Sequence, residues 1–104
     1  MLYVSKNISN YKTFHKMFEE MFHIQCIDLS KVSTNLLVSE VESILNHHKE
    51  CCVFLGYLEP GWMLDPTHQT RIRKLFRKFN VGLVVNFVES LPFSWKNEIH
   101  TLYI

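Results

Sequence analysis

Two apolar runs on either side of a helical segment constrain the fold of this chain more than any other feature. The runs cover residues 51–58 (CCVFLGYL) and 81–87 (VGLVVNF), and neither alternates apolar with polar side chains. Strands that are covered on both faces have this pattern, whereas a strand with one solvated face alternates. Residues 65–79 between the runs carry apolar side chains at helical spacing. Two buried strands joined through a helix form a right-handed crossover, and such strands run parallel.

The other segments continue this alternation. Residues 2–5 and 24–29 are predicted strands, residues 11–22 and 34–47 are predicted helices, and residues 101–104 form a predicted last strand. The chain is therefore predicted to be a single three-layer α/β domain over residues 1–104, with a mostly parallel five-stranded sheet. We expect a flavodoxin-like or related strand order with the terminal strands at the edges, and the last strand could run antiparallel. Residues 89–99 contain Pro92 and allow at most a short helix near residues 94–98.

The composition describes a small, nearly neutral domain. The chain has 104 residues and a formal net charge of +1, which fits one hydrophobic core and no strong overall field. It has no alanine but many Asn, Lys, Ile and Phe residues, which suggests an AT-rich genome and a viral or phage accessory protein. The three cysteines, a first segment unlike a signal peptide and no apolar run of about 20 residues predict an intracellular protein, cytoplasmic or nuclear, with reduced thiols.

The carboxyl ends of the predicted strands are where an open parallel sheet binds ligands. Residues 5–10 follow the first strand without a glycine, so we expect no nucleotide or flavin cofactor. Asp28, Glu59 and Glu89 follow three other strands. If these carboxylates converged, they could bind a divalent cation or act in acid–base catalysis, and the protein would be a small enzyme. Polar residues are also ordinary where a chain leaves the core.

Two histidines and two cysteines, His47, His48, Cys51 and Cys52, lie close together in the sequence. His and Cys are good zinc ligands, and each His lies four residues before a Cys. That spacing aligns ligands only within one helix, whereas here the histidines close a helix and the cysteines open a strand. Cys26 on a neighbouring strand could join them, but no second spaced pair exists. We therefore expect no metal site.

The predicted helix over residues 66–79 carries a face of one charge sign, made of Arg71, Arg73, Lys74, Arg77 and Lys78. Positions three and four apart share a helix face, and no acid interrupts this stretch. Such a face could contact phosphates or an acidic protein. Many charged helix faces are only solvated. A nucleic-acid-associated module is therefore the first alternative function.

The loop Trp62-Met63-Leu64 follows a turn predicted at Pro60-Gly61. Three large apolar residues in a loop either cap the core or contact a partner, and Trp is a favoured interface residue. Together with the apolar first helix, this loop favours association, either as a homodimer or with a partner protein. The sequence thus predicts a small non-enzymatic module that binds protein.

Overall fold

The computed structural model of this chain describes residues 1–59 and 61–102. Pro60 of the predicted turn and residues 103–104 of the predicted last strand lie outside them. The elements follow in the order β1 (Leu2–Ser5), η1 (Ile8–Asn10), α1 (Tyr11–Met21), β2 (Cys26–Asp28), α2 (Thr34–His47), β3 (Cys52–Tyr57), η2 (Trp62–Leu64), α3 (Pro66–Lys78), β4 (Asn80–Val84), η3 (Val88–Ser90), η4 (Phe93–Glu98) and β5 (Ile99–Leu102), where η denotes a short 3-10 helix.

The five strands form one sheet in the order β2-β3-β4-β1-β5, and every neighbouring pair is parallel. The predicted α/β class with a five-stranded parallel sheet is confirmed. The expectation of an antiparallel last strand is wrong, because the connection over residues 85–98 exceeds the roughly dozen residues that a parallel crossover needs. The order also differs from the flavodoxin order 2-1-3-4-5.

The first strand lies inside the sheet, where an edge position was expected. β1 pairs with β4 on one side and with β5 on the other, and its Leu2 and Val4 are completely buried. The chain leaves β1 through α1 and crosses to the far edge at β2, and then returns strand by strand to β4. β2 and β5 are the two edge strands.

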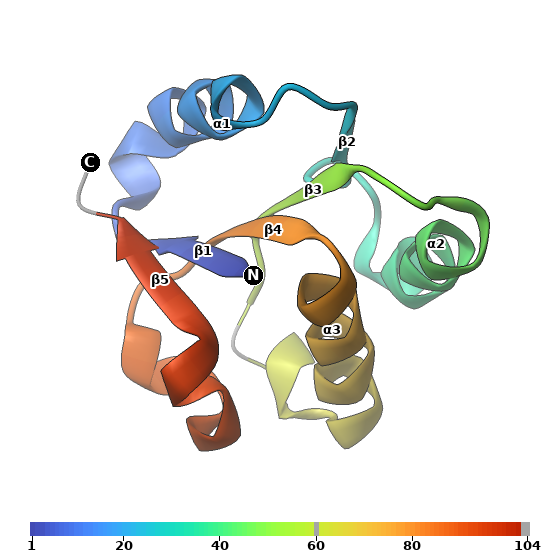
Figure 1. The fold of residues 1–104 in the computed structure, drawn as a ribbon. Coiled ribbons are helices and arrows are strands. Elements are labelled where there is room, and N and C mark those ends of the chain that lie inside the picture. Colours follow the sequence, from blue (N-terminus) through green and yellow to red (C-terminus); the bar gives the residue numbers. More distant parts are fainter. Residues whose placement is uncertain (60, 103–104) are drawn as a thin grey trace.

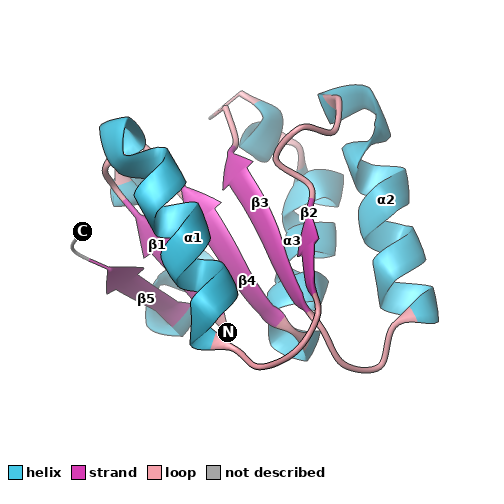
Figure 2. Ribbon diagram, turned by 90° about the horizontal axis from the view of Figure 1, so that it is seen from above, coloured by secondary structure: helices cyan, strands magenta, loops and turns pink. Residues whose placement is uncertain are grey.

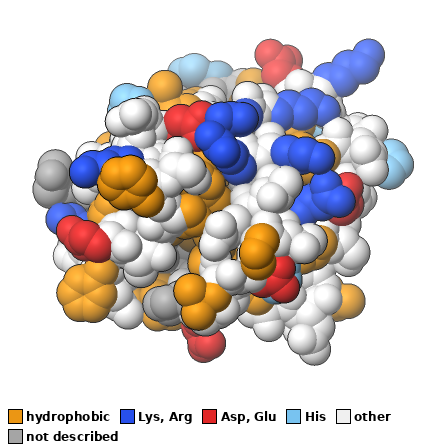
Figure 3. All heavy atoms as spheres, turned by 90° about the horizontal axis from the view of Figure 1, so that it is seen from below, with side chains coloured by type: hydrophobic (Ala, Val, Ile, Leu, Met, Phe, Trp, Pro, Cys, Tyr) orange, Lys and Arg blue, Asp and Glu red, His pale blue; other side chains and the backbone are white. Residues whose placement is uncertain are grey.

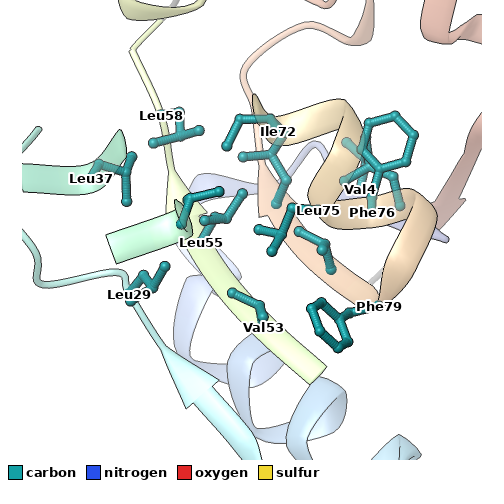
Figure 4. Close-up of a cluster of buried hydrophobic side chains, with 14 of the residues drawn as sticks. Val4, Leu29, Leu37, Val53, Leu55, Leu58, Ile72, Leu75, Phe76 and Phe79 are labelled. Carbon is teal, nitrogen blue, oxygen red and sulfur yellow. The ribbon is translucent and has the colours of Figure 1, made fainter. Parts of the chain in front are cut away.

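The helices cover the two faces of the sheet unequally. α1 lies alone on one face, while α2 and α3 lie on the other (Figures 1 and 2). The larger core fills the space between the sheet and α2 and α3, with Leu37, Val53, Leu55, Ile72, Leu75 and Phe76 among its members (Figure 4). The smaller core lies under α1 and contains Phe14, Phe18, Cys52, Phe54 and Val84.

The start of α3 shows why Asp65-Pro66 predicted the beginning of this helix correctly. The Asp65 side chain accepts a hydrogen bond from the Thr67 backbone N–H at 2.8 Å, and Pro66 occupies the first helical position, where no N–H is needed. The inward residues Ile72, Leu75 and Phe76 are buried. The helix predicted over residues 66–79 is confirmed to within one residue.

Gly56 makes an irregularity in β3 possible. Its φ of 68° lies in the left-handed region, and the β3–β4 register shifts between Phe54 and Gly56. A Cβ at Gly56 would lie 2.7 Å from the Cβ of Ser30, which is closer than such atoms approach. Only glycine therefore fits this position without a local shift.

Candidate binding surface

The predicted partner loop is η2, and the structure divides its three residues between core and surface. Met63 is buried in the larger core with 3% of its surface exposed. Trp62 is partly buried and stacks on His68 with ring centroids 4.1 Å apart, and the His68 Nδ1 lies 2.7 Å from the Trp62 carbonyl oxygen. Leu64 is 77% exposed. Of the three residues, Leu64 offers the largest exposed apolar surface to a partner.

Most of the basic side chains of α3 have partners within the chain. Arg71 forms an ion pair with Glu42 of α2. Glu98 of η4 forms an ion pair with Arg73 at 3.5 Å and a second ion pair with Arg77 at 3.0 Å. The Lys78 ammonium donates to the backbone carbonyl of Leu45 at 2.8 Å.

Lys74 is the remaining residue of the basic face of α3. It is exposed and forms no ion pair with the residues that the structure describes. The face that has one charge sign in sequence is thus partly neutralised by acids from α2 and η4. Figure 3 shows the mixture, with acidic side chains beside several of the Lys and Arg side chains.

The three carboxylates at the carboxyl edge of the sheet lie apart. Asp28 lies 3.6 Å from the Nε2 of His15, and its Oδ1 accepts the Ser30 N–H at 2.8 Å. Glu59 lines a groove between β3 and α2, and Glu89 lines a different groove beside β5. The described residues contain no group of three or more His, Cys, Asp or Glu side chains arranged to hold a metal ion. The convergence on which the enzyme alternative rests is not seen.

The His–Cys segment is split between a helix end and a buried strand. The His47 ring bonds to the Ser43 carbonyl oxygen at 2.9 Å on the surface of α2, whereas Cys51 and Cys52 are buried. Burial raises the pKa of both thiols. A protonated thiol is a poor metal ligand, so the burial of both cysteines disfavours the zinc alternative.

The connection from β4 to β5 builds an open groove with a mostly apolar lining. A groove of about 370 Å³ lies between this connection and the edge strand, and it is lined by Val88, Glu89, Leu91, Pro92, Phe93, Lys96 and Ile99. We call these residues the β5 groove. Phe93 is 84% exposed at its rim, and Phe87, directly before the groove, is 69% exposed. Figure 3 shows apolar side chains around a hollow on this side of the molecule.

The local sequence explains why the β5 groove stays open. Pro92 lies directly before η4 and holds an extended backbone, and Trp95 then turns inward, where it packs edge-on against Phe76 at 5.1 Å. With Trp95 in the core, Phe93 points away from it. The Lys96 ammonium lies 5.5 Å from the Phe93 ring centroid, so the rim carries a cation and Glu89 supplies an opposite charge.

Beside the groove, β5 presents a free edge. β5 pairs with β1 on its inner side, and no strand of the described chain pairs with its outer side. Its outward backbone N–H and C=O groups are therefore available to another chain. Among the described residues that line the groove there is no Ser, Cys or His, so the surface suits binding by apolar contact and backbone hydrogen bonds.

Sequence reasoning missed this surface because residues 85–87 were assigned to the predicted strand over residues 81–87 and residues 89–99 show no clear periodicity. The available signal was the pair Phe87 and Phe93 on either side of Pro92, one at the end of the predicted strand and one after it. No protein-family model matches this chain, and comparison with curated proteins and with solved structures finds no significant match. In the part of the chain that the structure describes, no helix has the length and apolar character needed to cross a bilayer.

Proposed function

We propose that this protein is a small non-enzymatic binding module that takes up an extended segment of a partner protein along β5. The observation that carries the proposal is the combination of the open β5 edge with the apolar β5 groove next to it. In strand addition, backbone hydrogen bonds to the edge supply affinity, and every second side chain of the added strand enters a pocket. Both parts of that arrangement are present on this side of the molecule.

The exposure of two phenylalanines supports a binding role. Burying a Phe side chain contributes about 1.5–3 kcal/mol, yet Phe87 and Phe93 are left mostly in water. Phe14, Phe18, Phe54 and Phe76 are by contrast almost completely buried. Apolar surface that is left exposed beside a groove and rimmed by charge is typical of an interaction site.

The size of the surface favours a short segment over a broad interface. With about 200 Å² for one Phe side chain, the exposed parts of Phe87 and Phe93 amount to roughly 300 Å². A stable complex of globular proteins buries about 800 Å² on each partner. The β5 groove therefore fits a strand of a few residues with apolar side chains at alternate positions. Because the charges of Lys96 and Glu89 nearly cancel, the added strand needs no strong charge of its own.

A homodimer is the second candidate, and the same edge favours it. Two copies of β5 could pair antiparallel about a twofold axis, which would join two sheets and cover both grooves. This alternative also uses Phe93, so mutation alone does not separate it from peptide binding. The concentration dependence of the mass in solution does separate them.

Selection from a displayed library of random linear peptides tests the proposal, with the full chain as bait. We expect peptides with apolar residues at alternate positions, and at least a tenfold weaker affinity for Phe93→Asp in fluorescence anisotropy. Leu36→Asp is the matched control, because Leu36 is 56% exposed on α2, away from the groove. It should bind the peptides as the wild type does.

Four outcomes decide between the candidates. Peptides that bind the wild type and Leu36→Asp, but not Phe93→Asp, support strand addition. Sedimentation that gives a dimer for the wild type and a monomer for Phe93→Asp supports the homodimer instead. Peptides that bind Phe93→Asp as tightly as the wild type contradict strand addition, and a wild type that sediments as a monomer at high concentration contradicts the homodimer.

A further inference from the structure

Two cysteines face each other across the β2 edge of the sheet, opposite to the β5 groove. Cys26 is the first residue of β2, Cys52 is the first residue of β3, and the two are register partners. Both belong to the side of the sheet that α1 covers, where Cys52 is part of the smaller core and Cys26 packs against it. As register partners on the same side of the sheet, their side chains lie next to each other. Cys51 lies in the core on the opposite face.

The backbone already brings this pair within reach of a covalent bond. Neighbouring strands lie about 4.8 Å apart, and disulfides join residues whose Cα atoms are about 4.4–6.8 Å apart. β2 is an edge strand of three residues that pairs on one side only, so a small shift of β2 can adjust the sulfur geometry.

We propose that Cys26 and Cys52 form a reversible redox pair whose oxidant is a peroxide. The Cys26 sulfur attacks one oxygen of hydrogen peroxide, the O–O bond breaks, and the products are a sulfenic acid on Cys26 and one water. The Cys52 sulfur then attacks the sulfenic sulfur and displaces its hydroxyl, which leaves with the Cys52 proton as a second water. Two thiols lose two electrons and two protons, and the peroxide takes up both. A small dithiol such as dithiothreitol returns the electrons and is itself oxidised to a disulfide.

The order of these steps follows from exposure. Cys26 is partly exposed at the sheet edge, whereas Cys52 is fully buried, so the oxidant meets Cys26 first and Cys52 resolves the sulfenic acid. Burial, followed by the interaction in which the Cys26 thiol donates toward the Cys52 sulfur, raises the pKa of the Cys26 thiol, and the Glu19 and Asp28 carboxylates act in the same direction. The reactive thiolate is therefore scarce at neutral pH, and oxidation should be slow and need sustained peroxide.

Thiol counting on the folded, reduced full chain tests the pair. After hydrogen peroxide treatment, maleimide labelling in denaturant should find that two of the three cysteines have become unreactive, and the intact mass should fall by two hydrogens. Peptide mapping should place the bond between Cys26 and Cys52. The oxidised monomer should melt at least about 5 °C higher, because the bond closes a long loop, and dithiothreitol should reverse the change.

Single substitutions give the matched controls. Cys51→Ser should still form the bond, since Cys51 lies on the other face of the sheet, whereas Cys26→Ser and Cys52→Ser should keep their remaining thiols reactive. A bond that includes Cys51, a disulfide between two chains, or a Cys26 that proceeds to the sulfinic acid without bond formation would each overturn the proposal. Three unreacted thiols in the folded chain, under conditions that oxidise the chain in denaturant, would overturn it as well.

Discussion

The two aromatic residues of η4, Phe93 and Trp95, should respond in opposite ways to truncation. Trp95 is 1% exposed and is the largest fully buried side chain among the described residues. Its ring packs edge-on against Phe76, so Trp95→Ala removes a large apolar contact and leaves a cavity. Such substitutions cost about 3–5 kcal/mol of unfolding free energy. Phe93→Ala should change it by about 0.5 kcal/mol or less, because an exposed ring leaves no cavity.

Urea unfolding followed by circular dichroism measures both variants. At a slope of about 2 kcal/mol per molar urea, the Trp95→Ala midpoint should fall by about 2 M, while that of Phe93→Ala should stay close to the wild type. This contrast would identify Phe93 as dispensable for stability, as a binding residue should be. Equal losses in the two variants, or a Trp95→Ala midpoint within about 0.3 M of the wild type, would refute the placement of η4 described above.

Three further predictions concern the sheet, the thiols and the basic helix. Gly56→Ala should lower the unfolding free energy by about 2 kcal/mol, since φ is 68° there, whereas Gly61→Ala, with no atom within 4 Å of its added Cβ, should be nearly neutral in the same melts. The thiol pKa is raised by folding, so stability should fall above about pH 9, by about 1 kcal/mol per pH unit for each thiol, and Cys52→Ala should flatten that slope. Heparin retention at low salt should drop more for Lys74→Gln than for Arg77→Gln, because Arg77 already has Glu98 as an acidic partner. Equal retention of the two variants would contradict the partial neutralisation of the basic helix.

The sequence predicted the centre of the sheet well because β3 and β4 are apolar on both faces and joined by a well-capped helix. Each of these signals is local. Asp65 accepts a hydrogen bond from the first turn of α3 and Pro66 occupies its first position, so two adjacent residues were enough to locate the helix start. The position of β1 was not predictable in this way. Its four residues are too few to distinguish an interior strand from an edge strand by pattern.

The candidate site was harder to predict because it depends on contacts between distant segments. Glu98 reaches Arg73 and Arg77 from the far end of the chain, so the partial neutralisation of the basic helix is invisible in the local sequence. The connection over residues 85–98 contains two short 3-10 helices, η3 and η4, and neither is long enough to give a periodic pattern. Trp95 is buried and Phe93 is exposed because Trp95 packs against Phe76, whose position is set by α3.

Amide hydrogen exchange on β5 tests the central claim most directly. The full chain is compared by NMR with and without a saturating peptide from the random library. Strand addition predicts slower exchange of outward-facing amides within Ile99–Leu102 and shifted side-chain signals of Phe93, with β2 at the opposite edge unchanged. Peptide binding that leaves the exchange of β5 unaltered and instead protects β2 or shifts α3 would contradict the account.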